Sequence, residues 1–203
     1  MIVIIDYGMG NLASVYNAFT KLGFRAITSN HPEEIANAGK IVLPGVGAFS
    51  EAMNNLINLE LDEAIKMAIG KGTPFLGICL GLQMLFGESE ENGLSKGLGI
   101  IEGKVHKFSL PFQYKIPHMG WNNITVLKDS RIFKGIPSNS YFYFVHSYYA
   151  APLKDNCIAA VSNYGIDFTC AIEVENVFAT QFHPEKSGAI GLKVLKNFGE
   201  MSR

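Results

Sequence analysis

Apolar and polar positions alternate along the first 90 residues in two different periods. Short apolar runs rich in β-branched residues fall at 2–5, 26–29, 41–44 and 74–78, and helical patterns lie near 11–22, 32–38, 50–70 and 80–87. Short buried strands that alternate with helices are typical of βαβ units in a mainly parallel sheet. Right-handed crossovers then place the loops that follow these strands along one edge of the sheet.

The second half of the chain predicts strands in succession. They are expected in "GKVHKF", "WNNITVL", "YFYFVHSYYA", "CIAAVSNYG" and "FTCAIEVENVFATQF". Glu175-Asn176 separates two alternating runs and indicates a tight hairpin, and a final helix is expected over 187–201. No composition break marks a linker, so we expect one α/β domain over 1–203, with a mainly parallel central sheet, helices on both faces and an additional antiparallel hairpin region.

The composition is that of a globular protein and argues against two classes of partner. Hydrophobic residues make up 48% of the 203 positions and charged residues 17%, and the formal net charge is -1. Without a positive field, binding to nucleic acid or to an anionic membrane surface is not expected. The apolar run at 2–5 is too short for a signal peptide, and no run approaches the roughly 20 residues of a membrane span. We therefore expect a cytoplasmic protein.

Three cysteines, an odd number, argue against a disulfide framework in such a chain. Cys157 and Cys170 are expected as small buried strand residues. Cys79 differs, because Gly77 and Gly81 flank it in "FLGICLGLQMLF". This is the G-x-nucleophile-x-G spacing of an elbow between a strand and a helix.

An elbow explains why the residues two before and two after the nucleophile lack side chains. The turn holds the nucleophile at an unfavourable backbone angle while strand and helix pack closely. The start of the helix also favours a thiolate, through its unpaired N–H groups and dipole. The pentapeptide alone is equally typical of a buried structural cysteine, so the decision depends on a base elsewhere.

The segment "TQFHPEKS" near the C-terminus offers such a base. His183 and Glu185 are two residues apart at the end of a predicted strand, and in extended backbone they project to the same side. A carboxylate beside an imidazole fixes its tautomer and stabilises the imidazolium that forms when it accepts a thiol proton. Together with the elbow, these residues predict a catalytic triad of Cys79, His183 and Glu185.

The segment "LPGVGAF" (43–49) follows a predicted strand one βα unit before the elbow. Its glycines allow a backbone N–H to point into a site without a side chain in the way. We predict an oxyanion hole formed by the N–H groups of Gly47 and Leu80.

Two cofactor sites are considered and set aside. The run Gly8 to Ala13 fits the G-x-G-x-x-A fingerprint of dinucleotide-binding proteins. That fingerprint also needs an acidic residue about 20 positions further on, where this chain has Asn30 and His31. The five histidines lack the ligand spacing of a metal site. We therefore expect no cofactor and no metal, and interpret the glycine-rich turn as a close-packing or partner-facing segment.

These segments together resemble the class I (triad) glutamine amidotransferase family over essentially the whole chain. The resemblance is carried by "DYGMGNL" (6–12), "LPGVGAF" (43–49), "IPHMGWN" (116–122), "YFYFVHSYYA" (141–150) and "QFHPEKS" (181–187). Within the family, "PHMGWN" is most similar to the glutaminase subunits of imidazole glycerol phosphate synthases. The resemblance implies the class I glutamine amidotransferase fold.

The resemblance also implies a chemistry and a set of substrate contacts. Cys79 would attack the carboxamide of L-glutamine, His183 would move the proton to the departing ammonia, and Glu185 would orient His183. Glutamine would be held by the backbone of Gly47 together with Gln83, Glu91, Ser147 and Tyr148. Glu91 would face the α-ammonium group.

The implied partner is a (βα)₈-barrel cyclase subunit in a heterodimer that makes imidazole glycerol phosphate for histidine biosynthesis. Aromatic residues and Met are enriched in interface cores, so Met119, Trp121, Tyr143 and Phe144 suit a docking face. Strand side chains alternate, and about half of these four are therefore expected in the core. Two alternatives stay open: the same glutaminase chemistry serving amination of a surface sugar, and a stand-alone cysteine hydrolase.

Overall fold

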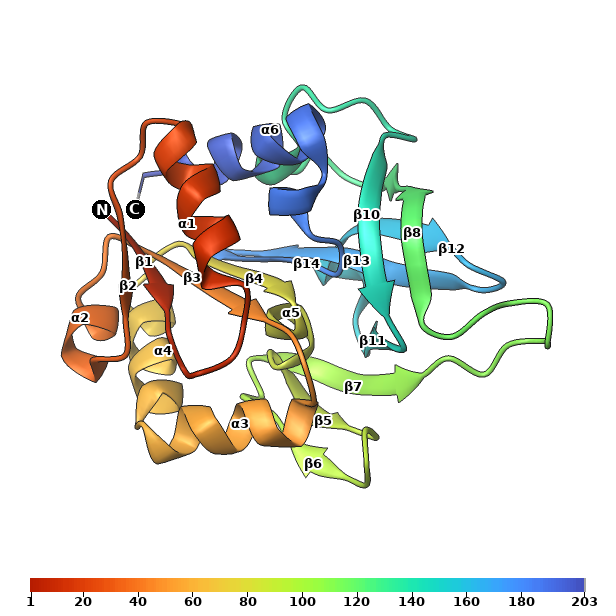
Figure 1. Ribbon diagram of the computed structural model, residues 1–203, viewed down its shortest axis with the longest axis horizontal. Coiled ribbons are helices and arrows are strands. Elements are labelled where there is room, and N and C mark those ends of the chain that lie inside the picture. The colour runs from red at the N-terminus through yellow and green to blue at the C-terminus, as the bar shows by residue number, and fades with distance from the viewer. Residues whose placement is uncertain (203) are drawn as a thin grey trace.

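Strand β1 (Ile2–Ile5) shows how the core is divided. In the computed structural model, which describes residues 1–202, Val3 and Ile5 belong to one buried hydrophobic cluster and Ile2 and Ile4 to another. Alternate strand residues point to opposite faces, so both faces of the sheet are covered. Helices α2 (Pro32–Ala36), α3 (Phe49–Asn58) and α4 (Leu61–Gly70) cover one face, and α1 (Leu12–Lys21) and α6 (Gly188–Gly199) cover the other (Figure 1).

The main sheet of twelve strands has a parallel part and an antiparallel part. Its parallel part has the order β2 (Ala26–Ser29), β1, β3 (Lys40–Gly45), β4 (Phe75–Cys79) and β14 (Val177–Thr180). It continues through β13 (Asp167–Val174), β11 (Tyr148–Pro152), β7 (Ile101–Lys107), β5 (Phe86–Ser89) and β6 (Ser95–Lys96). Strand β12 (Ile158–Asn163) pairs with β13, and β9 (Thr125–Val126) with β12.

A separate antiparallel sheet is formed by β8 (His118–Asn123) and β10 (Tyr141–His146). The predicted α/β class, with a mainly parallel sheet, helices on both faces and an antiparallel region, is confirmed. The antiparallel region is larger than a hairpin, because most strands of the second half extend the main sheet. Among residues 1–202, every helix is too short or too polar to cross a lipid bilayer.

The predicted helix over 80–87 is wrong in its second half. Helix α5 (Leu80–Gln83) is one turn long, and Phe86 already belongs to β5, where it pairs with Ile101 of β7. The run after Cys79 is almost entirely apolar, and periodicity cannot separate a buried helix from a buried strand in so short a run.

The predicted hairpin at Glu175-Asn176 is confirmed between β13 and β14. Glu175 has a φ of 51°, and the Asn176 side chain donates hydrogen bonds to the carbonyls of Ile69 and Thr73. The hairpin directs β14 into the sheet beside β4, with Thr180 opposite Ile78. A strand from the end of the chain thereby runs parallel to the strand that ends at Cys79.

Candidate active site

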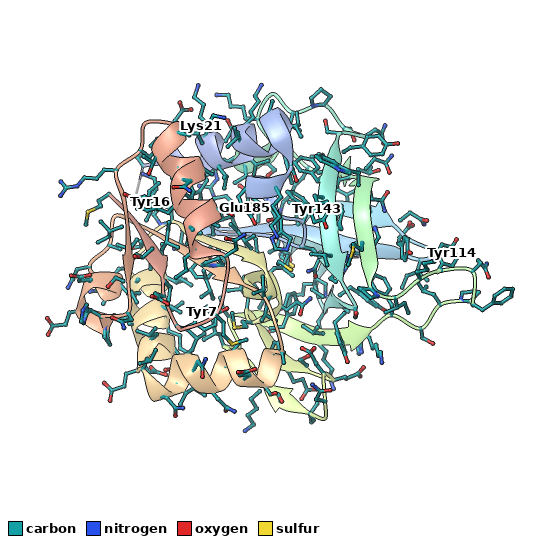
Figure 2. All side chains as sticks on the ribbon, in the orientation of Figure 1. Tyr7, Tyr16, Lys21, Tyr114, Tyr143 and Glu185 are labelled. Atoms are coloured by element: carbon teal, nitrogen blue, oxygen red, sulfur yellow. The ribbon has the colours of Figure 1, made fainter. Side chains whose placement is uncertain are left out.

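Three segments that are far apart in sequence meet at the carboxyl edge of the parallel strands. Gly45 at the end of β3 is opposite Cys79 at the end of β4, and Thr180 ends the neighbouring β14. The chain then continues through the 3₁₀ helix η3 (Pro184–Lys186). The main-chain N–H of His183 donates to the carbonyl of Tyr143 on β10, which brings the second sheet to the same edge (Figure 2 labels Tyr143 and Glu185).

Cys79 occupies a strained turn between strand and helix. Its φ of 56° and ψ of -107° are unusual for a residue with a side chain, and α5 begins at the next residue. A Cβ on Gly77 would lie 2.6 Å from the carbonyl oxygen of Gly81, and one on Gly81 would collide with the carbonyl of Leu43. The two glycines therefore stand where the elbow has no space for a side chain.

The His183 and Glu185 side chains form a buried pair. His183 Nδ1 and Glu185 Oε1 are 2.9 Å apart, and the two side chains are 2% and 1% exposed. The predicted contact is present, but the predicted geometry is wrong, because Pro184 starts a 3₁₀ turn and Glu185 is not in extended backbone. Within residues 1–202, the buried side-chain nitrogen and oxygen atoms with no hydrogen-bond partner are His183 Nε2 and Glu185 Oε2. Such atoms are rare in folded proteins and call for an explanation, which a reaction supplies.

The surroundings of His183 favour its protonated form. Burial lowers the pKa of His183, but its interactions with Cys79 and Glu185 outweigh burial and raise the pKa to about 10. Because Nδ1 is held by Glu185, Nε2 is the nitrogen left to exchange a proton with the sulfur. An imidazolium in this position can stabilise a thiolate and later give its proton to a leaving group.

The other two cysteines have a different environment. Cys157 and Cys170 are free and buried, and burial raises the pKa of each thiol. Cys170 lies in β13 as predicted, whereas Cys157 ends the 3₁₀ helix η2 (Asp155–Cys157) rather than lying in a strand. Cys79, in contrast, interacts with the His183 imidazole, so Cys79 is the cysteine with the environment of a nucleophile.

A pocket of about 280 Å³ opens onto Cys79 and His183. It is lined by most of the residues that the sequence predicted, namely Gly47, Cys79, Leu80, Gln83, Glu91, Ser147, Tyr148 and His183. Four lining residues were not assigned a site role from the sequence: Val46, Pro117, Val145 and His146. Glu185 does not line the pocket and lies behind His183. The volume is just below the usual range for drug-sized ligand sites and is large enough for a small ligand such as a free amino acid.

Glu91 and Tyr148 shape the polar part of this pocket. Glu91 Oε2 accepts a hydrogen bond of 2.7 Å from the main-chain N–H of Phe49, at the start of α3. This bond fixes the carboxylate. Burial and the negative charge of Glu91 raise the pKa of Tyr148. The pocket thus holds one oriented negative charge that a ligand ammonium group can approach.

The segment that contains Gly47 is held from the other side by the start of the chain. The Tyr7 hydroxyl donates a hydrogen bond of 3.0 Å to the carbonyl of Pro44, and burial together with the charge of Cys79 raises the pKa of Tyr7. A Cβ on Gly10 would lie 3.5 Å from that same carbonyl oxygen. The glycine-rich turn therefore lies beside the site, in ordinary van der Waals contact with the segment that contains Gly47, and its glycines adopt positive φ angles of 82° (Gly8) and 120° (Gly10).

A hydrogen-bond chain connects the nucleophile to Gln83. Gln83 Nε2 donates to the carbonyl of Tyr148 and to Gln181 Oε1, both at 3.1 Å, and Gln181 Nε2 lies 3.7 Å from Cys79 Sγ. Sequence reasoning missed Gln181. It stands in the segment that supplies His183, but a glutamine at a strand end carries no motif that would have identified it.

Two of the four residues of the predicted docking face are largely exposed, and whether a partner binds there stays a prediction. Met119 and Trp121 on β8 are 62% and 56% exposed, and Tyr143 on β10 lies opposite Trp121 with its ring 6.3 Å away. Phe144 is fully buried and is therefore one of the residues of this set that belong to the core, as the alternation of strand side chains led us to expect for about half of them. It points inward because it follows Tyr143 on a strand whose side chains alternate. The histidines His118 and His146 also point inward from these strands, and residues 1–202 contain no metal-binding cluster of three or more His, Cys, Asp or Glu side chains.

Known proteins of one family match this chain over nearly its whole length. The family described as glutamine amidotransferase class-I matches residues 3–201. Imidazole glycerol phosphate synthase subunit HisH of Syntrophotalea carbinolica is 51% identical, over 99% of this chain and 100% of the relative. The protein of the same name from Methanocaldococcus jannaschii is 53% identical, again over 99% and 100%.

Solved structures share the fold at lower identity. A crystal structure described as glutamine amidotransferase superposes with a TM-score of 0.76 at 17% identity and covers 98% of this chain and 100% of its own. The structure of PurLQS from Thermotoga maritima gives 0.75 at 18%, with coverage of 97% and 96%.

Proposed function

The chain belongs to the class-I glutamine amidotransferase family, and on that premise we propose that it is the glutaminase subunit of an imidazole glycerol phosphate synthase. It hydrolyses L-glutamine to glutamate and ammonia for a step of histidine biosynthesis. The observation that carries the proposal is the pairing of a strained, pocket-facing Cys79 with His183, whose Nδ1 is held by Glu185 and whose Nε2 has no other partner.

The reaction proceeds in two halves at the sulfur. The Cys79 thiolate attacks the side-chain carbonyl carbon of glutamine, and the N–H groups of Gly47 and Leu80 stabilise the oxyanion. His183 gives its proton to the departing nitrogen, so the C–N bond breaks, ammonia leaves and a glutamyl thioester remains. His183 then takes a proton from water, which attacks the thioester and releases glutamate. Glu185 keeps Nε2 directed at the sulfur throughout.

The pocket orients free glutamine for this attack. The fixed carboxylate of Glu91 pairs with the α-ammonium group, and Ser147, Tyr148 and Gln83 line the path of the side chain. A substrate without a free α-amino group leaves Glu91 unpaired, so peptides are poor substrates.

Ammonia must reach its acceptor without protonation, because ammonium has no lone pair for attack. A (βα)₈-barrel cyclase subunit is the partner in a heterodimer, and a shielded channel leads ammonia to it. There it joins a phosphoribosyl-formimino-carboxamide ribonucleotide to form imidazole glycerol phosphate and aminoimidazole carboxamide ribonucleotide. The face formed by Met119, Trp121 and Tyr143 is rich in large apolar and aromatic side chains and includes part of β10, the strand whose Val145 and His146 line the pocket, which suits it to this docking.

Replacement of the nucleophile tests the proposal. Cys79→Ser in complex with the cyclase should abolish synthesis from glutamine and leave synthesis from added ammonium salt close to that of the unaltered complex. Loss of both activities would mean that the substitution damages the fold or the docking. Failure of the unaltered complex to use glutamine with the cyclase's nucleotide substrate would contradict the proposal, and a barrel partner that aminates a sugar would then be tried.

A stand-alone cysteine hydrolase is distinguished by a labelling experiment. An electrophilic glutamine analogue should modify Cys79, and peptide substrates should not be cleaved. Peptidase activity without a cyclase would favour the hydrolase.

A further inference from the structure

Gln181 is a buried polar residue to which the reaction above assigns no role. It is fully buried in the segment between β14 and His183, and its Nε2 lies 3.7 Å from Cys79 Sγ. A sulfur accepts an N–H in either protonation state, but a thiolate gains most, because hydrogen bonds to a charged acceptor are roughly twice as strong as neutral ones. The Cys79 thiol has a donor direction of its own, toward the carbonyl of Val145 at 3.9 Å. The site therefore has one partner for each form of the sulfur: the Val145 carbonyl accepts from the thiol, and the Gln181 amide donates to the thiolate.

The orientation of the Gln181 amide follows from a backbone carbonyl. The Tyr148 carbonyl can only accept, so the Gln83 atom that faces it at 3.1 Å must be Nε2. The same Nε2 faces Gln181 at 3.1 Å, and that atom of Gln181 must be Oε1. The other end of the amide, Nε2, then faces the sulfur. If Gln181 were reversed, two N–H donors would oppose each other and an oxygen would face the thiolate.

The same carbonyl also fixes the donor pattern of two histidines, His146 in the pocket wall and His118 next to it. His146 Nδ1 donates to Tyr148 O at 2.8 Å, so His146 Nε2 must accept from His118 Nδ1 at 2.9 Å. His118 Nε2 then accepts from Asn122 Nδ2, which also donates to the carbonyl of Asn163. Burial lowers the pKa of His118 to about 4 and that of His146 to about 3, so both rings are neutral at pH 7 and the pattern of donors does not change.

We propose that Gln181 is a catalytic residue that stabilises the Cys79 thiolate through its amide N–H, and that Gln83 holds the amide in the orientation this requires. The inference rests on the proposed function only in taking Cys79 as the nucleophile. The N–H stabilises the charge before attack, and its contribution declines when the sulfur becomes a neutral thioester.

Alkylation of Cys79 by iodoacetamide tests the inference without glutamine. The rate is followed as a function of pH by peptide mass spectrometry in the full chain, which separates Cys79 from Cys157 and Cys170. Gln181→Met removes the donor, and Gln181→Glu places a negative charge there. A charge-assisted hydrogen bond contributes about 1.5 kcal/mol, so alkylation near neutral pH should slow about tenfold in the Met variant and further in the Glu variant.

Gln113→Glu is the matched control, because Gln113 is exposed on the loop between β7 and β8. It should leave the alkylation profile unchanged. Gln83→Met tests the orienting role with Gln181 intact and should slow alkylation by a smaller factor than Gln181→Met. Thermal unfolding of each variant shows which are folded.

Unchanged alkylation profiles in folded Gln181→Met and Gln83→Met variants would overturn the inference. If the Gln181 variants do not fold, Gln83→Met decides alone. A slowed alkylation in a protein that fails to use glutamine with any cyclase would uphold the inference and refute the proposed function, so the two failures are distinguishable.

Discussion

Cys79 keeps its unusual backbone angles because the neighbouring chain leaves it no room to relax. Gly77 packs against the carbonyl of Gly81, and Gly81 against the carbonyl of Leu43 on the neighbouring strand. These obstacles are backbone atoms, which cannot turn aside as a flexible side chain can. The two glycines were predictable from their spacing, whereas the obstacle on β3 was not, because it depends on which strand lies beside β4.

Gly81→Ala should therefore destabilise the protein by about 2–3 kcal/mol. Denaturant unfolding gives the change. Gly70→Ala is the matched control, because Gly70 ends α4 with no atom within 4 Å of an added Cβ, and it should be neutral or stabilising by up to about 1 kcal/mol. Equal effects of the two substitutions would contradict the close packing of the elbow.

The pH dependence of glutamine hydrolysis should reflect the raised pKa of His183. Since that pKa is about 10, His183 is protonated below it and loses its proton above it, so ammonia release should fall as pH rises through about 10. Initial rates measured from neutral pH upward show this fall at high pH, the alkaline limb of the pH profile. A limb near the ordinary histidine pKa would contradict the stabilising contacts with Cys79 and Glu185.

Glu185→Gln removes one of the two interactions that raise the pKa of His183. The alkaline limb should then move to lower pH, and turnover should fall by about a hundredfold or more, since the imidazole loses its orienting charge. Stability measured in parallel separates this effect from unfolding. If the rate falls at the same pH in the variant as in the unaltered protein, the Glu185 carboxylate does not raise the pKa of His183.

At the scale of elements, the strands of the first half were predictable because β-branched runs stand between clear helical patterns. The end of α5 was not, because the sequence after Cys79 is apolar on every side and only pairing with β7 makes it a strand. In β10 the alternation was visible, but the sequence does not show which set of alternating residues faces inward. Contact with the main core, which buries Phe142 and Phe144, decides that question.

Strand β8 should carry much of the affinity for the cyclase. Trp121→Ala and Met119→Ala should each weaken binding by about 1–3 kcal/mol, because large side chains in an interface core contribute most of the energy. Titration calorimetry with the cyclase measures this. Met67→Ala is the matched control, since Met67 is 54% exposed on α4, away from β8 in Figure 1. Undiminished affinity in both β8 variants would place the docking surface elsewhere.

At the scale of the whole molecule, the sequence indicated the triad but not how its members meet. Gln181 and Cys79 are 102 residues apart, and they come together because β14 enters the sheet between β4 and β13. Motif spacing predicted Cys79, His183 and Glu185 one segment at a time. The supporting residues Gln181, His146 and His118 have no such spacing, and their roles depend on burial and on a shared backbone carbonyl.

Two buried neutral histidines should make the protein sensitive to mild acid. The unfolded chain binds protons at His118 and His146 below about pH 6.5, whereas the folded chain does so only near their lowered pKa values of about 4 and about 3. The free energy of unfolding therefore falls as pH falls through this window. At about pH 5 His146 alone accounts for about 2 kcal/mol.

Melting temperatures at neutral and mildly acidic pH measure this loss. His146→Gln should reduce the fall in melting temperature on acidification, even if the variant is less stable at neutral pH. His31→Gln, at an exposed position, should leave the fall unchanged. An equal fall in the unaltered chain and in the His146 variant would contradict the neutral buried state.

The position of β14 has a consequence for synthesis on the ribosome. Residues 177–180 fill the gap between β4 and β13, and residues 181–185 follow them directly. Until these residues emerge, a nascent polypeptide has a cysteine without its base and two sheet portions with facing open edges, which are prone to pair with other chains. Translation therefore supplies the nucleophile early and the base late, and ammonia release can begin only after residues 177–185 have emerged and joined the sheet.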